Sequence, residues 1–164
     1  MADWTIRDVT DADLDQVVAV NHANEPEVGP LDEPRVALFR SAAERFQAVE
    51  VGGDLVGVFV GLVEDLDYAS PNYRWFCDRH ERFAYVDRIA LQPAARGLGV
   101  AAAIYEEFAA WAATSGRPVL CAEVNTEPPN PRSLAFHRRQ GFEVVDEIAP
   151  YGGRERVAMV EKVL

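Results

Sequence analysis

The sequence predicts an α/β (α+β) fold, with a mixed central sheet of about seven strands flanked by about four helices. Three observations lead to it. Apolar runs of strand length alternate with helix-length patterns along the chain. Two glycines stand between one apolar run and an alanine-rich helix, and two more runs close the chain as a hairpin. The resulting order is β-α-α-β-β-β-α-β-α-β-β, a mixed sheet with helices on both faces.

The first part of the chain is expected to supply a strand, two helices and a hairpin. Thr10 is a candidate N-cap, followed at helical spacing by apolar residues such as Leu14 and Val17. Gly52-Gly53-Asp54 is a strong turn signal between two apolar runs. The expected elements are a strand at 4–7, a helix after Thr10, a loop at 24–30, a helix at 32–43, and strands at 46–51 and 55–62.

A polar, aromatic-rich connection is expected at 64–82, before a long strand that ends near Leu91. The alanine-rich helix follows the glycine turn, and a glycine after a last helix marks the start of the closing hairpin. The remaining elements are a helix at 99–115, a strand at 119–124, a helix at 130–140, and strands at 142–148 and 154–163.

Composition limits the class of protein. With 164 residues, 49% of them hydrophobic, we expect a single domain over residues 1–164. The chain has no apolar run of membrane-spanning length, no secretory signal pattern, and only two cysteines, so we expect a cytoplasmic protein. The net charge of −11 argues against nucleic acid or an anionic membrane as a partner and favours a cationic acceptor such as an amine.

The turn at 92–99 has the chemistry of a phosphate-binding loop. Glycines let backbone approach a ligand, and the free N–H groups at the start of a helix attract anions. Gly97-x-Gly99-x-x-Ala102 formally fits a dinucleotide fingerprint. However, five residues separate Leu91 from Gly97, and too few residues follow for a doubly wound fold. The alternative pattern is Arg96-x-x-Gly99-x-Ala101, which resembles the pyrophosphate-binding motif of the GNAT acetyltransferases.

A second motif supports that resemblance. The segment from Asn130 to Gly141-Phe142 is similar to the other GNAT signature, in which an asparagine begins a short helix and Gly-Phe follows it. An apolar strand separates the two motifs in the expected order. The chain is therefore identified as a member of the GNAT superfamily, and it resembles bacterial single-domain predicted acetyltransferases over its whole length.

The resemblance implies an acetyl-CoA-dependent N-acetyltransferase with no metal, which acts by direct attack of a primary amine on the thioester. The amine would belong to a small molecule or a protein N-terminus, and the enzyme could form a homodimer. The alternative is a non-catalytic sensor of acetyl-CoA or CoA. The residues expected to contact the cofactor are Ile89, Ala90, Leu91, Arg96, Gly97, Leu98, Gly99, Val100, Ala101, Asn130, Ser133, Phe136, His137 and Arg139.

Three residues are candidates for proton transfer. Glu123 ends a strand where some family members carry their base, and Asp87 lies where many others carry a glutamate; a structural salt bridge is the alternative for each. Arg88 neighbours Asp87 but is expected on the opposite strand face. His137 stands where many GNATs have an acid tyrosine, so it is a candidate acid, with a cofactor contact or a packing role as alternatives.

Aromatic residues are candidates for the acceptor pocket, since their faces suit a cation or a flat apolar group. The loop at 24–30 and the connection at 68–76 would form this pocket. Packing beneath the connection, or a dimer contact, is the alternative reading. The residues expected to contact the acceptor are Tyr68, Tyr73, Trp75 and Tyr85.

Overall fold

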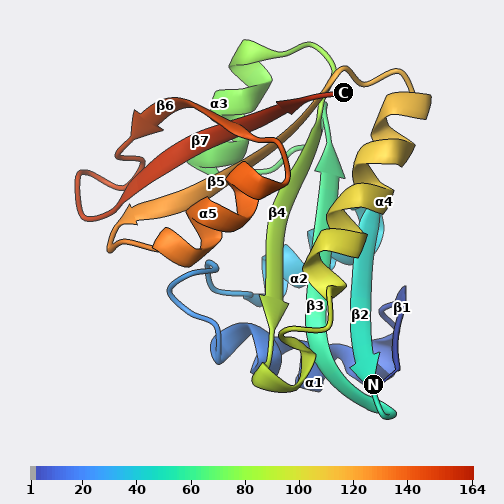
Figure 1. The fold of residues 1–164 in the computed structure, drawn as a ribbon. Helices are drawn as coiled ribbons and strands as arrows, with labels where there is room; N and C mark the ends of the chain where they lie inside the picture. Colours follow the sequence, from blue (N-terminus) through green and yellow to red (C-terminus); the bar gives the residue numbers. More distant parts are fainter. Residues whose placement is uncertain (1–2) are drawn as a thin grey trace. The chain divides into compact units, whose positions relative to one another are not determined.

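The computed structural model describes residues 3–164 and confirms the predicted mixed sheet. Within this range seven strands follow the order β1-β2-β3-β4-β5-β7-β6. The strands are β1 Trp4–Asp8, β2 Arg45–Val51, β3 Asp54–Val63, β4 Ala84–Leu91, β5 Val119–Glu127, β6 Glu143–Ile148 and β7 Arg156–Val163. The helices are α1 Leu14–His22, α2 Glu33–Ala42, α3 Pro71–Arg79, α4 Val100–Thr114 and α5 Pro131–Arg139, with 3-10 turns at Asp11–Asp13 and Pro93–Ala95 (Figure 1).

The chain divides into two compact units. Unit 1 contains the described residues up to Leu62 and the segment Val86–Ile104, whereas unit 2 contains Val63–Tyr85 and Tyr105–Leu164. The boundaries fall inside β3, β4 and α4, so parts of these three elements belong to each unit. Each unit has its own core and its own candidate functional residues. That residues 1–164 form one functional domain stays a prediction.

Unit 1 is built on the antiparallel meander β1-β2-β3. The turn between β2 and β3 uses two glycines in the left-handed region, Gly52 at φ +61° and Gly53 at φ +89°, as the sequence predicted. Helix α2 packs against β2, and the rings of Phe39 and Phe46 meet edge to face with centroids 5.8 Å apart. Apolar residues of β2 and β3 are buried in this unit, whereas no residue of β1 is fully buried.

Local chemistry fixes where the first helices begin. Asp13 and Thr10 form a capping box: the Asp13 carboxylate accepts from the Thr10 backbone N–H at 2.7 Å. Asp32 caps α2 by accepting the Arg35 backbone N–H at 3.1 Å, and a proline occupies the first turn. The predicted helix boundaries are therefore correct to within a few residues.

Unit 2 contains the parallel pair of the sheet. Tyr85 of β4 pairs with Cys121 of β5, while β7 runs antiparallel between β5 and β6. Helix α5 packs against β5 (Figure 1). It begins at the N-cap Asn130, and the chain leaves it through Gly141 at φ +92°.

Helix α3 was not predicted, so five α-helices are present in residues 3–164 where about four were expected. Its start signal is plain in retrospect: the Ser70 hydroxyl accepts the Tyr73 N–H at 3.4 Å, and Pro71 takes the first helical position. Tyr73 and Phe76, three residues apart, turn their rings to the same side, where they pack with Phe83 and Tyr85. Packing of these aromatic rings stabilises a helix in a segment that the sequence predicted to be an irregular connection.

No helix in the described residues is both long enough and apolar enough to serve as a membrane span.

Candidate active site

The glycine turn of unit 1 has the backbone shape that a phosphate-binding loop needs. After β4 ends at Leu91, a 3-10 turn leads to Gly97 at φ +73° and Gly99 at φ +76°, and α4 begins at Val100. Only glycine adopts this left-handed region without strain. A Cβ built on either glycine meets no atom within 4 Å, so the requirement is conformational and the space beside both glycines is open. The backbone of the turn is thus open to an approaching ligand at both glycines.

The charges around this turn favour an anion. The first turn of α4 carries no acidic side chain, and the N–H groups of a first helical turn lack partners within the helix. Arg96 is exposed, and its Nη2 donates to the Leu91 carbonyl at 3.3 Å. This contact folds a guanidinium back over the strand end. The residues fit the diphosphate of a coenzyme A.

The other residues of unit 1 expected to contact the cofactor differ in exposure. Along β4 the side chains alternate, as a strand requires: Ala90 is buried, whereas Ile89 and Leu91 are partly exposed. In the turn and the start of α4, Val100 is buried and the others keep some exposure; these others are Gly97, Leu98, Gly99 and Ala101.

Glu123 and Tyr85 form the carboxylate centre of unit 2. The Tyr85 hydroxyl donates to both carboxylate oxygens of Glu123, at 2.9 Å to Oε1 and 2.7 Å to Oε2. The Tyr85 ring is fully buried against Tyr73 and Phe76, whereas Glu123 is partly exposed. A rigid phenol therefore orients a carboxylate that solvent can reach. Tyr85, expected in the acceptor pocket, instead supports Glu123.

Asp87 of unit 1 sits in an ion pair with Arg88, although Arg88 was not expected to be an easy partner from the opposite face of the strand. Arg88 Nε donates to Asp87 Oδ2 at 2.7 Å because the long side chain folds back along its own strand. Its Nη1 also donates to Asn21 Oδ1 and to the Gly29 carbonyl, each at 2.8 Å, and the guanidinium lies 5.4 Å from the Phe39 ring centroid. This arrangement favours the structural alternative for Asp87.

His137 in unit 2 is buried, and both ring nitrogens have partners. Nδ1 lies 2.8 Å from the Ser133 carbonyl oxygen, and Nε2 lies 2.9 Å from the Tyr105 hydroxyl. Since a carbonyl only accepts, Nδ1 carries the proton and Nε2 accepts from Tyr105. Burial lowers the pKa of His137, and the Ser133 carbonyl offsets this only in part. The imidazole is thus held neutral.

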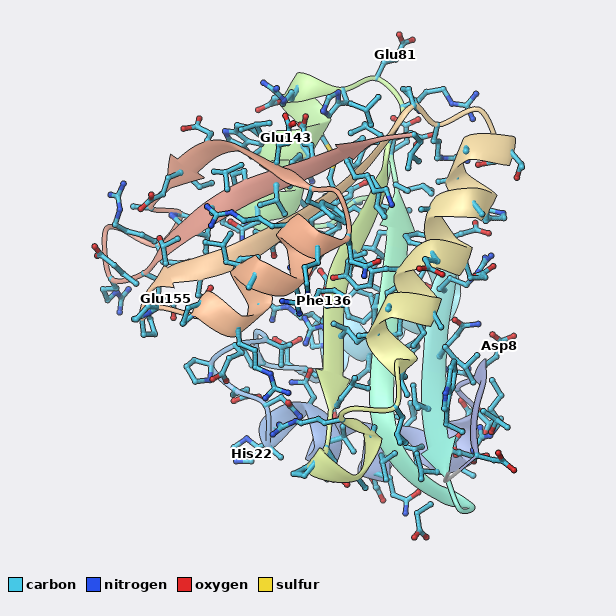
Figure 2. The ribbon with its side chains drawn as sticks, in the orientation of Figure 1. Asp8, His22, Glu81, Phe136, Glu143 and Glu155 are labelled. Atoms are coloured by element: carbon cyan, nitrogen blue, oxygen red, sulfur yellow. The ribbon has the colours of Figure 1, made fainter. Side chains whose placement is uncertain are left out.

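The remaining residues of the second motif organise α5. Asn130 Oδ1 accepts the Ser133 N–H at 3.2 Å, so the signature asparagine is the N-cap. The rings of Tyr105, Phe136 and Phe142 surround His137 edge to face. Phe136, which is labelled on α5 in Figure 2, is only partly buried. Arg139 is exposed, so a cofactor contact for it stays a prediction.

The aromatic residues proposed for the acceptor pocket are mostly core residues. Tyr73 is fully buried; its hydroxyl donates to the Val63 carbonyl at 2.6 Å and accepts the Leu66 N–H at 3.1 Å. Tyr68 is buried against it, with ring centroids 5.6 Å apart. Trp75 keeps partial exposure, with Arg79 5.5 Å from its ring centroid. Packing beneath the connection therefore accounts for Tyr68 and Tyr73, and this corrects their assignment to an open pocket.

Sequence reasoning missed Tyr105 and the role of Asn21. A tyrosine inside an alanine-rich helix was a usable signal, because a buried hydroxyl needs a partner and His137 was already singled out. Asn21 was read only as part of the helical spacing, but it is fully buried and binds Arg88.

Solved structures of the same fold cover this chain almost end to end. Arabidopsis thaliana Naa50, in complex with the bisubstrate analogue CoA-Ac-MVNAL, has a TM-score of 0.75 at 17% identity, covering 98% of this chain and 99% of that one. Chaetomium thermophilum Naa20, in complex with a bisubstrate analogue, has a TM-score of 0.78 at 20% identity, covering 98% and 86%. The ribosomal-protein-S18-alanine N-acetyltransferase from Escherichia coli has a TM-score of 0.70 at 18% identity, covering 98% and 94%.

At these identities the likenesses show the fold. No curated protein matches the chain as a sequence relative. The family comes from the sequence itself, since residues 13–142 match the model of the acetyltransferase (GNAT) family. Because that match spans most of its length, the chain belongs to the GNAT acetyltransferases.

Proposed function

We propose that this GNAT family member uses acetyl-CoA to acetylate a primary amine of a small molecule or a protein N-terminus. The observation that carries the proposal is the glycine turn, whose positive-φ glycines leave open space at the start of a helix that has no acidic residue in its first turn. The backbone N–H groups of this turn would hold the diphosphate, and Arg96 would add positive charge. This concentrates positive charge locally in a protein of net charge −11.

Glu123 is the proposed base. It would take a proton from the acceptor ammonium, so that the amine lone pair can attack the thioester carbonyl carbon. The carbon–sulfur bond then breaks, CoA leaves as a thiolate that takes a proton from solvent, and the amide nitrogen gives up its extra proton to solvent. Tyr85, which donates to both Glu123 oxygens, would fix the direction in which the carboxylate faces. Asp87 is less suited, because it is nine-tenths buried and paired with Arg88.

Direct attack, without an acetylated enzyme, fits the state of the two cysteines. The Cys121 thiol is fully buried, and burial raises its pKa. Burial also raises the pKa of Cys77. A nucleophilic cysteine needs the opposite, a thiolate stabilised by neighbouring positive charge.

For His137 we favour the packing role over the acid role. The neutral ring uses its one N–H on the Ser133 carbonyl and its lone pair on Tyr105. His137 thus links Tyr105 of α4 to Ser133 of α5. It has no spare proton to give to a thiolate near neutral pH. Asn130 and Ser133 remain candidates for cofactor contacts.

The acceptor is proposed only as a class. Among proteins of the same fold, Naa50 binds the bisubstrate analogue CoA-Ac-MVNAL, and the Escherichia coli enzyme is a ribosomal-protein-S18-alanine N-acetyltransferase. An acidic protein suits a cationic amine. In unit 1, Arg88 fastens the loop at Gly29 and would thereby shape an acceptor site formed by residues 24–30.

The second candidate function is a non-catalytic sensor of acetyl-CoA or CoA. It is favoured by His137, which stands where many GNATs have an acid tyrosine. A thiol-release assay distinguishes the two when acetyl-CoA is offered with a panel of peptides bearing free N-termini and of small amines. We expect release with at least one amine and its loss in Glu123→Gln. Tight acetyl-CoA binding without turnover on any amine would favour the sensor.

A further inference from the structure

Three potential metal ligands of different chemistry meet in unit 2, apart from the carboxylate centre. Cys121 of β5 lies directly opposite Glu161 of β7 in the antiparallel register, so their side chains share one face. His80, which ends α3, reaches the same place. One ligand atom from each residue lies within 4.8 Å of the other two.

The three groups are held in place by burial and by existing contacts. Cys121 is fully buried, the Glu161 side chain is 10% exposed, and the His80 side chain is 22% exposed. His80 Nε2 lies 2.6 Å from Glu161 Oε1, which also accepts from Arg79 Nε at 2.7 Å. The imidazole nitrogen therefore already faces the carboxylate, and its exposed edge gives an ion a route from solvent.

We propose that Cys121, His80 and Glu161 form a zinc-binding site, with water as the fourth ligand. Thiolate sulfur, imidazole nitrogen and carboxylate oxygen are the donors that Zn²⁺ takes in proteins, and three protein ligands with one water is a familiar set. A tetrahedral ion at bond lengths of about 2.0–2.3 Å spaces its ligand atoms about 3.5 Å apart. To reach this spacing, His80 Nε2 and Glu161 Oε1, which lie 2.6 Å apart, must move apart, whereas any separation that approaches the 4.8 Å limit must shorten.

Charge balance supports the site. A thiolate and a carboxylate together neutralise the charge of Zn²⁺, whereas the neutral imidazole adds no charge. Binding replaces the proton shared between His80 and Glu161 and releases the proton of the Cys121 thiol. The contacts of Glu161 with His80 and Arg79 account for a buried carboxylate without a metal. They do not account for the Cys121 thiol beside it.

The resemblance to GNAT acetyltransferases implied no metal, and these three donors are far apart in the chain and form no short ligand motif. They meet only through the β5–β7 register and the end of α3, which the sequence analysis did not anticipate.

Titration of the purified protein with Co²⁺, followed by displacement with Zn²⁺, tests the proposal without any assay of acetyl transfer. We expect a thiolate-to-cobalt charge-transfer band that saturates at one ion per chain and disappears on adding Zn²⁺. Cys121→Ser should abolish the band and weaken Zn²⁺ binding by more than about 100-fold, beyond the effect of losing an outer-shell partner. Cys77→Ser, the matched control, should retain both.

Two further variants sharpen the test. His80→Gln, at a partly exposed position, should weaken Zn²⁺ binding and remove the rise in Tm that Zn²⁺ causes in the wild type. It serves as the main variant if Cys121→Ser does not fold. Arg79→Gln removes a competing cation and should strengthen binding by about 10-fold, the size of an outer-shell effect. The proposal is overturned if the folded wild type gives no band, or if the band follows Cys77 instead of Cys121.

Discussion

The glycine turn of unit 1 and the side-chain pairs of unit 2 are two different ways of building a functional site. At 92–99 the working parts are backbone groups, and glycine conformation sets their direction. In unit 2 they are side chains positioned by partners distant in sequence, as Tyr85 positions Glu123 and Tyr105 positions His137. The first device depends on a local run of residues, whereas the second depends on packing.

This contrast predicts different failures. A change in the turn should affect cofactor binding while leaving the core untouched. A change to Glu123 should affect the chemical step, and a change to the Tyr105–His137 pair should affect stability before catalysis.

The largest effect is expected for Glu123→Gln, which keeps the size and the Tyr85 contact but removes the base. Turnover should fall by about 10²–10⁴-fold, the usual range for a lost general base, with acetyl-CoA affinity nearly unchanged. Steady-state kinetics with a responsive amine, together with calorimetric titration of acetyl-CoA, measure the two quantities. Glu127→Gln, an exposed residue at the end of the same strand, is the control and should keep full turnover. Equal turnover in both variants would exclude Glu123 as the base.

A smaller but more specific effect is expected for Gly99→Val. A branched residue is strained at φ +76° and enters the open space beside the turn. Acetyl-CoA affinity should fall by more than about tenfold as the N–H groups are redirected. Gly53→Val is the matched control, because Gly53 also has a positive φ and open space but lies in the β2–β3 hairpin. If both variants weaken binding alike, general strain and not the turn is responsible.

Variants of the Tyr105–His137 pair should lower the free energy of unfolding more than they lower turnover. Tyr105→Phe leaves the buried His137 Nε2 without a donor, which costs about 1–3 kcal/mol of unfolding free energy. Turnover should stay within a few-fold of the wild type. Urea denaturation of Tyr105→Phe, His137→Phe and the double variant forms a cycle, and the two changes should be less than additive. A turnover loss of about 100-fold in folded His137→Phe would restore His137 as the acid.

The features that could be predicted from the sequence are the local ones, and those that could not depend on packing. The β2–β3 turn, the cap at Thr10 and the glycine turn were predicted, because each depends on the conformational preferences of two to four neighbouring residues. The Asp87–Arg88 pair was misjudged, because strand alternation gives the direction of Cβ and not the reach of a long side chain. Tyr73 was taken for a pocket residue, because an aromatic that packs and one that binds look alike without the helix that places them.

The smallest effect is expected in the pH dependence of stability. The native-state pKa of His137 is lowered from its ordinary value of 6.5, so the unfolded chain binds a proton more readily. The stability that the neutral ring supplies is fully present above pH 6.5 and is lost as the pH falls below it, toward the native-state pKa. Urea denaturation at pH 7.5 and pH 5.5 should show a larger loss in the wild type than in His137→Gln. Equal losses in the two proteins would mean that His137 titrates normally.

The most direct test of the account is a single paired measurement of acetyl-CoA affinity and turnover in Gly99→Val and Glu123→Gln. The account predicts a separation: Gly99→Val binds acetyl-CoA more than about tenfold more weakly, whereas Glu123→Gln binds it normally and turns over at least about 100-fold more slowly. An unchanged acetyl-CoA affinity in folded Gly99→Val would contradict the account, since the backbone turn would then not hold the cofactor.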